Sequence, residues 1–531
     1  MQRRKFAAGA YLLAGAVAVA PNVALAAEYY VATDGSDAGA GTAADPWATL
    51  AHAASVVAPG DVVHVLPGNY AGFTLETSGT EGAPIRFVAE PGVIIDTPGP
   101  TGDGIRLQNV SDVVIEGFRI VGMPDRGIAH RGATPDAPSR RLVIRGNVIE
   151  MAAHEGMYLS EVADSIVEYN TITDVGTDGP DVRGHCIYLA NAGSDGTTIR
   201  GNELARCLKA GVHFNGDASI GGDGVISGLV IERNWIHDNA QNGLNMDGVQ
   251  DSVIAGNVIE GNASNGIRAY RIDAAEGPRD LVIVANTIVV PSGGGWCVRI
   301  TEEAGNGGSV VFDNVLTGLG DFGGAIALDG TPGFASDYNV VTGSFSPDRG
   351  DTLLDLAGWQ GLGYDGASIV ADPQEVFVDV GGGDFHLRDG AVAIDFGVDT
   401  YMGRTAPSVD MDGRPRPLGG AIDAGAYEYC PPGDDCTGGG TGGTGATTGA
   451  GGTAGTSTTG GGSGAGTAAT GSAGSTGASG ETATGSGAGS GAGGDGCGCD
   501  ARRSGRTGGA LLVVLLVLGR SRRQGSVGCA R

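Results

Sequence analysis

The sequence predicts an all-β protein, a parallel β-helix solenoid, and three observations support this fold class. A phrase of the form apolar-x-Ile/Val-x-x-Asn-apolar recurs between Leu142 and Asn339, at intervals of 23 to 32 residues, the length of a solenoid rung. Between these phrases, Gly-led segments such as GVHFN and GLNMD alternate apolar and polar residues, as half-buried strands do. The same region lacks helical periodicity. Each rung is therefore predicted to hold at least two short strands joined by turns.

The recurring asparagines are predicted to form a buried ladder at one corner of the solenoid. Stacked Asn side chains can bond one another and the backbone amides that a turn leaves free. We therefore assign them a structural role and no chemistry. The predicted members are Asn147, Asn170, Asn202, Asn234, Asn257, Asn286, Asn314 and Asn339.

Charge limits the partners that the chain can have. Its 531 residues carry a formal net charge of −28 with only 32 Lys plus Arg. This acidity argues against nucleic acid and anionic membranes as partners. An acidic substrate would need a bound cation or a local arginine cluster to screen the site. We expect a monomer.

The two ends of the chain have the composition of export and anchoring segments. Residues 1–26 read as a secretory signal, with a basic start, an apolar stretch and a small-x-small cleavage site at Ala24-Leu25-Ala26. Residues 437–496 are almost entirely Gly, Thr, Ala and Ser, which predicts a disordered linker. Residues 497–531 hold Cys497, Cys499, a short apolar run and an arginine cluster. This last segment resembles the C-terminal sorting signal of myxobacterial surface proteins, which implies attachment to the cell envelope at the outer membrane or cell surface.

Residues 27–343 are predicted to form an N-terminal cap and the solenoid. The cap includes Asp45-Pro46-Trp47 before a short amphipathic helix that runs through Val57. It resembles the cap of extracellular pectin-lyase-like proteins, which are right-handed parallel β-helices. That superfamily includes polysaccharide lyases acting on pectate and on glycosaminoglycans, so the resemblance implies architecture first and a polysaccharide partner second.

In residues 344–436 the repeat dissolves and a different module is predicted. The phrases AIDFG, DMDGRPRP and IDAGAYEY occur there in this order. They resemble the closing module of secreted β-helix proteins tethered to cell surfaces, of the choice-of-anchor type, which implies that this region ends the solenoid and leads into an anchor. Its charged residues are predicted to make turns and ion pairs: Asp410, Asp412, Arg414 and Glu428. Cys430 and Cys436 are close enough in sequence for a small disulfide loop in an oxidising compartment.

Alignment of the rungs on their Gly-led strands predicts two rows of outward side chains, with neighbouring members about 4.8 Å apart. The first row contains Ala129, Tyr158, Tyr188, His213, Asn245, Arg268, Arg299 and Ala327. The second contains Arg131, Ser160, Ala190, Asn215, Asp247, Tyr270, Thr301 and Asp329. Nearby loops could wall these rows with His154, Glu155, Asp178, Asp181, Arg183 and His185. Because polar and aromatic residues gather at the centre of the rows and alanines lie at the ends of the first, we predict a groove for an extended polymer.

The chemistry of these side chains suits an acidic polysaccharide. Tyr rings stack on sugar rings, and the planar guanidinium group of Arg binds a carboxylate through two N–H groups. The predicted substrate-binding residues are Tyr158, Asn215, Asn245, Asp247 and Tyr270. Elimination or C5 epimerisation of a uronate needs a cation on the carboxylate and a base beside the carbon. We assign the first role to Arg268 and Arg299, the base to His213 and the acid to Tyr188.

A calcium site is an additional hypothesis. Oxygen ligands from Asn215, Asp217 and Asp247 could hold the ion and would ease the approach of an acidic substrate, although Asn and Asp are also common turn residues. No other cofactor is expected. The paired Asp motif of polygalacturonase-like hydrolases is missing, so hydrolysis is disfavoured.

Three functions stay open from the sequence. The leading interpretation is an exported cell-surface β-helix acting on an acidic polysaccharide as a lyase or epimerase. The second is a surface glycan binder or adhesin without turnover. The third is a structural stalk. Enzyme and binder differ in whether a base, an arginine and the target carbon converge.

Overall fold

The computed structural model of the chain describes residues 26–177, 183–301, 307–330, 332–431, 433 and 436. The predicted signal peptide up to residue 25, the loop residues Asp178 and Asp181, and the predicted linker and sorting segment lie outside these residues. The predictions made for them stay predictions. No helix within the described ranges is long and apolar enough to cross a bilayer.

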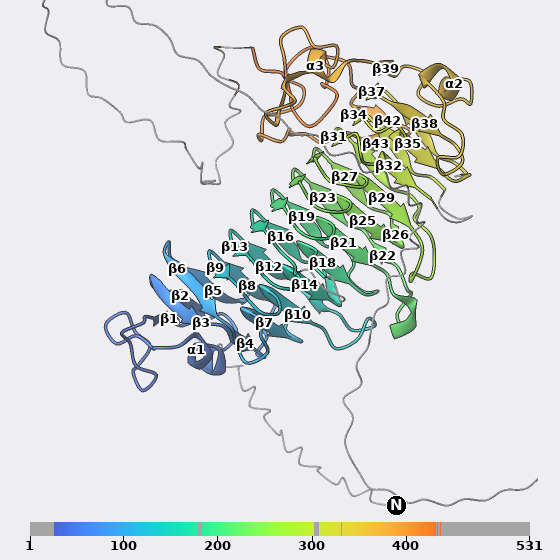
Figure 1. Cartoon of the computed structure of the whole chain (residues 1–531). Coiled ribbons are helices and arrows are strands. Elements are labelled where there is room, and N and C mark those ends of the chain that lie inside the picture. Colours follow the sequence, from blue (N-terminus) through green and yellow to red (C-terminus); the bar gives the residue numbers. More distant parts are fainter. Residues whose placement is uncertain are drawn as a thin grey trace, which may run out of the picture. The chain divides into compact units, whose positions relative to one another are not determined.

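Three parallel sheets run from β1 to β39, and the chain visits each sheet once per rung (Figure 1). Sheet A contains β1 (Glu28–Val31), β2 (Val62–Val65), β5 (Ile85–Ala89), β8 (Val113–Glu116), β12 (Leu142–Arg145), β16 (Ile166–Glu168), β19 (Thr198–Arg200), β23 (Val230–Glu232), β27 (Val253–Ala255), β30 (Val282–Val284), β33 (Val310–Phe312) and β36 (Ala335–Asp337).

Sheet B contains the Gly-led strands: β4 (Phe73–Leu75), β7 (Ile105–Gln108), β10 (Ile128–Arg131), β14 (Met157–Ser160), β18 (Ile187–Ala190), β21 (Val212–Asn215), β25 (Leu244–Asp247), β29 (Ile267–Tyr270), β32 (Trp296–Ile300), β35 (Gly324–Leu328) and β38 (Ser344–Ser346). Sheet C contains β3 (Gly68–Ala71), β6 (Val93–Thr97), β9 (Arg119–Val121), β13 (Val148–Glu150), β17 (Thr171–Thr173), β20 (Glu203–Ala205), β24 (Trp235–His237), β28 (Val258–Glu260), β31 (Thr287–Val290), β34 (Val315–Gly318), β37 (Val340–Thr342) and β39 (Ile369–Val370). The parallel β-helix prediction is thus confirmed, with three strands per rung.

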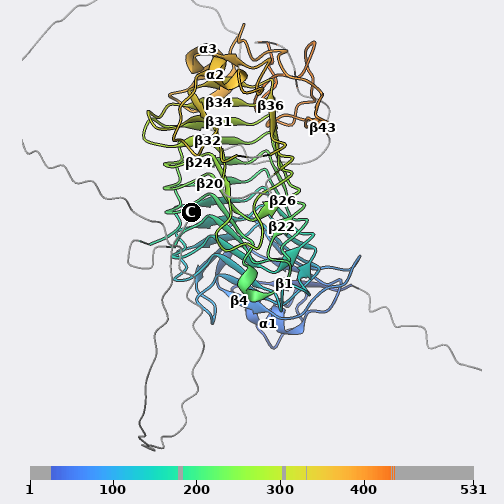
Figure 2. The same cartoon turned by 90° about the vertical axis from the view of Figure 1, so that its right-hand side faces the viewer.

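Shorter elements complete the fold. The two-stranded pairs are β11 (Ser139–Arg140) with β15 (Val162–Ala163), β22 (Ile226–Ser227) with β26 (Val249–Gln250), β40 (Phe377–Asp379) with β41 (Asp384–Leu387), and β42 (Thr400–Tyr401) with β43 (Arg404–Thr405). The α-helices are α1 (Leu50–Val56), α2 (Leu356–Gln360) and α3 (Pro373–Val376), and a short 3-10 helix spans Ala218–Ile220. Figure 2 shows the rungs stacked between α1 at one end and α2 and α3 at the other.

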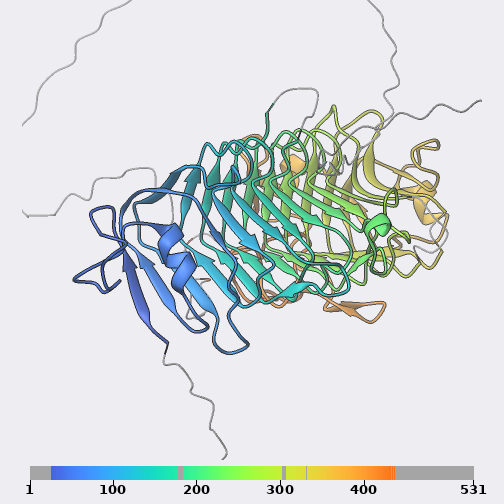
Figure 3. The same cartoon turned by 90° about the horizontal axis from the view of Figure 1, so that it is seen from below.

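The N-terminal segment is both a cap and part of the sheets. The predicted helix is present as α1, which begins after Thr49, whose side chain accepts the N–H of His52. It covers the open end of the first rungs (Figure 3), where Leu50 and Ala53 are buried. In the sequence analysis the repeated phrase was found only from Leu142 onward, whereas β1 and β2 of the predicted cap already pair in sheet A. Their repeat was not recognised because a non-repetitive insertion, including α1, separates the two strands.

The asparagine ladder is confirmed in detail. Each member is at most 1% exposed, and the Nδ2 of every member except the last donates to the Oδ1 of the next member at 2.9–3.0 Å. The same Oδ1 also accepts the backbone N–H of the preceding member. The last member, Asn339, donates to Asp365 Oδ1 at 2.9 Å. Each side chain therefore ties its own rung to both neighbours.

The Gly that precedes most strands of sheet B permits close packing of rungs. At Gly243 a Cβ would lie 2.4 Å from Cγ2 of Ile259 and 2.8 Å from the carbonyl oxygen of Gly266. A side chain there would force the next rung away, so the sequence keeps Gly at the position where the turn enters the sheet.

The closing module lies against sheet C as well as beyond the last rungs. Its apolar residues, such as Phe377 and Phe385, form one cluster with Val289 and Val315 of that sheet. The N–H of Ala426 donates to Thr287 Oγ1 at 2.9 Å. Residues 344–429 thus bury a flank of the solenoid, which the resemblance did not imply.

The charged residues of the closing module have the roles predicted for them. Asp410 accepts the N–H of Arg414 at 2.7 Å and of Glu428 at 3.0 Å. Arg414 also pairs with Asp412, and Glu428 pairs with Arg416 at 3.1 Å. The predicted disulfide between Cys430 and Cys436 is present, and a second one joins Cys186 to Cys207 in adjacent rungs.

One inward position of sheet B holds a histidine where neighbouring rungs have leucine. His130 pairs in register with Leu107 and Leu159 and is 0% exposed. Its Nδ1 lies 3.1 Å from the carbonyl oxygen of Ser160, to which it donates, and its Nε2 has no hydrogen-bond partner among the described residues. Burial lowers the pKa of His130 to about 4, so the folded protein keeps it neutral.

The low pKa of His130 predicts a pH-dependent stability. Below an unfolded-state pKa of about 6.5 the unfolded chain binds a proton that the folded chain refuses until about pH 4. Stability from this group is therefore full at pH 7 and is lost as the pH falls. We expect His130→Leu to gain about 3 kcal/mol relative to wild type between pH 7 and pH 4. Denaturant unfolding of both proteins at the two pH values measures this, and a difference independent of pH would contradict it.

Candidate functional site

The predicted outward row exists in the register expected. Strand pairing aligns Tyr158 with Tyr188, Tyr188 with His213, His213 with Asn245, Asn245 with Arg268, and Arg268 with Arg299. We call these six residues of sheet B the candidate row. Ala129 and Ala327 pair with its two ends, and the second row is aligned alongside through Asn215, Asp247 and Tyr270.

The centre of the candidate row is less open than outward-facing strand positions suggest. His213 is 8% and Asn245 7% exposed, and Tyr270 in the second row is 4% exposed. Two loops, residues 216–225 and 271–279, follow β21 and β29 and contact each other: the N–H of Ala218 donates to the carbonyl of Asp273. Tyr158, Tyr188, Arg268 and Arg299 stay half-buried. A polymer would therefore contact the rings and guanidinium groups rather than the full row.

An aromatic patch occupies one half of the candidate row. The Tyr158 and Tyr188 rings meet edge to face at 5.5 Å, and Tyr188 lies 4.6 Å from the His213 ring. His185 stacks on His213 at 4.6 Å. Of the loop residues predicted to wall the groove, His185 thus joins the site directly. The guanidinium group of Arg131 lies over Tyr158 at 5.1 Å.

A chain of buried amides orients His213. Asn265 donates its backbone N–H to Asn242 Oδ1 at 3.0 Å, which fixes the orientation of the Asn242 amide. Asn242 Nδ2 then donates to Asn245 Oδ1 at 2.9 Å. Asn245 Nδ2 therefore faces His213 Nδ1 at 2.8 Å and donates to it. We call this the amide relay.

The amide relay decides which nitrogen of His213 carries the proton. Because Nδ1 accepts a hydrogen bond, the neutral ring holds its proton on Nε2. Burial, with a contribution from the charge of Lys209, lowers the pKa of His213 to about 4. His185 likewise accepts the N–H of Ala210 at its Nδ1, and burial holds its pKa well below the usual value. Both stacked imidazoles are thus suited to donate hydrogen bonds from Nε2, and a role for His213 as a general base is disfavoured by this geometry.

Arg268 is a cation without an acidic partner among the described residues. Most arginines of the solenoid pair with a carboxylate, such as Arg86 with Glu116 at 3.4 Å. The Arg268 guanidinium instead lies over the Tyr270 ring at 4.6 Å. Tyr270 is held from the other side, because its hydroxyl accepts Asn245 Nδ2 at 2.7 Å. Arg299 also contacts backbone, with Nη2 at 3.4 Å from the carbonyl of Arg349.

Lys209 lies near the candidate row, although the sequence analysis did not include it among the site residues. It lies in the turn before β21, where its N–H donates to the carbonyl of Gly184 at 2.9 Å, and its charge contributes to the low pKa of both His185 and His213. Lys5 and Lys209 are the two lysines of the chain, and the remaining basic residues are arginines. That scarcity was a signal available in the sequence.

The predicted calcium ligands make hydrogen bonds within the protein. Asp247 accepts the N–H groups of Ile272 and Asp273, each at 2.8 Å, and Asp217 accepts the N–H of Ser219 at 2.7 Å. Asn215 donates to the Tyr188 hydroxyl at 3.1 Å, and its Oδ1 is buried with no hydrogen-bond partner among the described residues. These residues order the loops beside the row, and no step is assigned to calcium.

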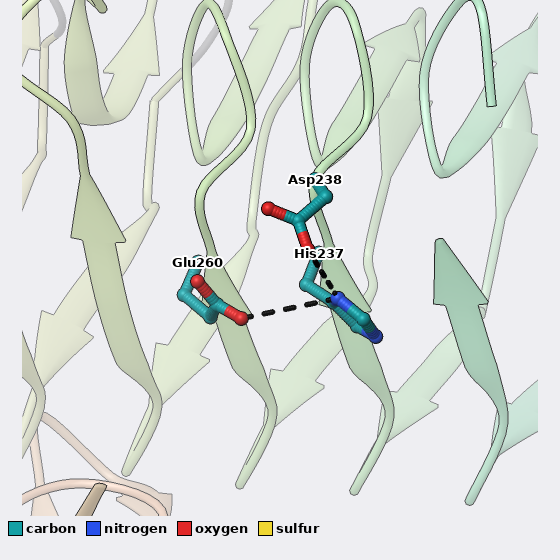
Figure 4. A group of neighbouring side chains, drawn as sticks. All are labelled: His237, Asp238 and Glu260. Carbon is teal, nitrogen blue, oxygen red and sulfur yellow. Dashed lines mark hydrogen bonds and ion pairs between the residues drawn. The ribbon is translucent and has the colours of Figure 1, made fainter. Parts of the chain in front are cut away.

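A second group of side chains lies on sheet C. Among the described residues, His237, Asp238 and Glu260 form the one group of three His, Cys, Asp or Glu residues whose ligand atoms lie within 4.8 Å of one another (Figure 4). The sequence offered no signal for it, because Glu260 and His237 come from different rungs.

Comparisons with known proteins agree with the fold. A family model described as Pel9A-like, right handed beta helix region, matches residues 29–177, and a right handed beta helix region model matches residues 180–341. A search of curated proteins gave no match. Among solved structures, pectate lyase Pel9A is similar at 15% identity and a TM-score of 0.52, over 77% of this chain and 98% of that chain.

Two further structures are similar at lower scores. XylC in complex with xylose shares 11% identity over 75% of this chain and 98% of that chain, with a TM-score of 0.48. An alginate lyase from Paenibacillus sp. str. FPU-7 shares 15% identity over 56% of this chain and 95% of that chain, with a TM-score of 0.40. At such identities the likeness concerns the fold. Residues 29–177 and 180–341 are thus right-handed β-helix regions, as the two family models describe them.

Proposed function

We propose that this protein binds an acidic polysaccharide along the candidate row and modifies its uronate units by elimination or C5 epimerisation. The observation that carries this proposal is Arg268, a half-buried cation without a carboxylate partner among the described residues, in a chain of net charge −28. A free arginine held in place by a tyrosine ring is ready to receive an external carboxylate.

The neighbouring side chains fit a sugar polymer on either side of that carboxylate. Tyr158 and Tyr188 offer rings to sugar faces, and they lie in register with Arg268 on the same sheet. Tyr188 and Arg268 are three rungs apart, about 14 Å, which is a span for an extended chain rather than a single sugar.

Both reactions begin with removal of the C5 proton next to the carboxylate. In this proposal Arg268, with Arg299 one rung away, neutralises the charge that develops on the carboxylate. The amine of Lys209, after it has released its own proton to solvent, takes the C5 proton, whereas arginine keeps its proton. Elimination then expels the C4 oxygen, which takes a proton from water, because Tyr188 lies three rungs from Arg268 and so meets a different sugar of the chain. Epimerisation instead returns a proton to the opposite face of C5.

His213 enters this scheme as a donor and not as the base first assigned to it. Its Nε2–H is fixed by the amide relay, and its low pKa keeps the ring neutral at pH 7. A neutral imidazole donor can bond a sugar hydroxyl without competing for the carboxylate that Arg268 holds. Asn215, Asp247 and Tyr270 support the loops and rings that border the row.

The rest of the proposal concerns location. Export by the predicted signal peptide, monomeric behaviour and attachment to the cell envelope through the predicted sorting segment are consistent with a substrate outside the cell. The alternative function is a surface glycan binder in which the same row holds the polymer without turnover.

A panel of polyuronates tests the proposal. We expect purified protein to produce unsaturated chain ends, seen by ultraviolet absorbance, or inverted C5 centres, seen by proton NMR, on at least one of pectate, alginate or a glycosaminoglycan. Parallel assays with added calcium and with a chelator test the calcium hypothesis. Binding without any product would favour the glycan binder, and neither binding nor product would favour a structural stalk.

A further inference from the structure

The group on sheet C lies away from the candidate row and is not used by the proposed function. His237 ends β24, Asp238 follows it in the turn, and Glu260 ends β28 in the next rung. Figure 4 shows the imidazole of His237 with Nδ1 turned toward both carboxylates. Strand pairing places His237 directly beside Glu260, so the backbone sets this arrangement.

The distances in this group suit a small metal ion. His237 Nδ1 lies 2.9 Å from Asp238 Oδ2 and 3.9 Å from Glu260 Oε1. Ligand atoms around a tetrahedral zinc ion with bonds of about 2.1 Å are about 3.4 Å apart. The two distances lie on either side of that value, so shifts of about half an ångström would complete the geometry.

A second observation concerns the other nitrogen of the same ring. His237 Nε2 has no hydrogen-bond partner among the described residues, yet it points at Glu203 Oε1 of the preceding rung, 3.6 Å away. The side chain of His237 is 8% exposed, and Trp235 stacks on it at 4.0 Å. A metal-binding histidine characteristically has a carboxylate behind its free ring nitrogen, which fixes the ring and its proton. Glu203 occupies that place.

We propose that His237, Asp238 and Glu260 bind a divalent transition-metal ion of the zinc type, with Glu203 as the residue that orients the imidazole. A nitrogen ligand favours such an ion over calcium or magnesium, which take oxygen ligands. The Asp238 side chain is 57% exposed, so the ion can enter from solvent and keep water in its fourth position. Bound metal would link two rungs of the solenoid through their side chains.

The alternative for this group is a protonated histidine held by carboxylates, with no affinity for metal. The closing module offers a matched control for it. His386 also contacts two carboxylates, but Asp384 lies 2.6 Å from Nδ1 and Asp412 lies 3.0 Å from Nε2. Its two acidic partners are on opposite sides of the ring, so they cannot share one ion with a single nitrogen.

Zinc titration of the purified full-length protein decides between these possibilities. We expect wild type and His386→Ala to bind one more Zn²⁺ per chain than His237→Ala. Thiols elsewhere in the chain would bind zinc equally in all three proteins, so the comparison removes their contribution. After cobalt substitution, the difference spectrum between wild type and His237→Ala should show visible d–d absorption without the intense sulfur-to-metal band of thiolate ligands.

A milder variant protects the test against misfolding. Glu260→Gln keeps the size of the side chain and should weaken this zinc site by about tenfold or more, with little change in melting temperature when no metal is added. Added zinc should raise the melting temperature of wild type and of His386→Ala, and of Glu260→Gln much less. Equal zinc stoichiometry in wild type and His237→Ala, or unchanged affinity in Glu260→Gln, would overturn the proposal.

Discussion

Replacement of Asn234 by alanine should lower the free energy of unfolding by about 2 to 5 kcal/mol. Asn234 is 0% exposed at the middle of the asparagine ladder. Its Oδ1 accepts two hydrogen bonds from Asn202, and its Nδ2 donates to Asn257 and to the carbonyl of Ile199. The variant leaves the buried N–H of Asn202 and the buried carbonyl of Ile199 without this partner, and each such group costs about 1 to 3 kcal/mol.

Asn69→Ala provides the control for this measurement. Asn69 lies on β3, is exposed, and bonds the exposed Asp96, so its loss should change stability by less than about 0.5 kcal/mol. Denaturant unfolding with a common slope measures both variants. If the two variants had equal free energies of unfolding, water would replace the ladder bonds in Asn234→Ala. The ladder would then fix the alignment of the rungs without adding to stability.

The second large effect is expected at Arg268. If the row grips a uronate, Arg268→Ala removes a charge-assisted bond of about 1.5 to 3 kcal/mol, which lowers kcat/KM or affinity by a factor of about 10 to 100. Arg268→Lys keeps the charge but loses the forked geometry, and it should recover only part of the loss. The measurement is kcat/KM on the best polyuronate of the panel, or Kd where binding occurs without turnover.

Arg86→Ala is the matched control for Arg268. Arg86 lies on sheet A and pairs with Glu116, so its removal should leave activity unchanged. A loss of activity in both variants would indicate a general loss of stability, and a silent Arg268→Ala in an active protein would exclude the proposed carboxylate contact. Variation of ionic strength adds a readout, because a charge contact weakens with salt in wild type and not in Arg268→Ala.

Periodicity in the sequence was sufficient to predict the solenoid and the register of one sheet. The alternation in GVHFN and GLNMD distinguishes inward from outward residues, and parallel strands of the same phase can stack in only one way if the apolar face is to stay buried. His213, Asn245 and Arg268 therefore lie side by side as predicted. The asparagine ladder was predicted by the same argument. A buried Asn at the same position in every rung has the Asn of the neighbouring rungs as hydrogen-bond partners.

The chemistry of the site depended on contacts between residues of different rungs and turns. The turn that carries Lys209 and the loops beside β21 and β29 differ in length from rung to rung. The repeat in the sequence therefore does not predict their conformation. The proton position on His213 depends on Asn265 through two intervening amides, and the group at His237 depends on a pairing with β28. By itself the sequence determined the rungs, the ladder and the order of the row, because these follow from local alternation and burial. Tertiary structure decided the exposure, the protonation and the partners of each side chain, because desolvation and hydrogen bonding are set by neighbours that are distant in sequence.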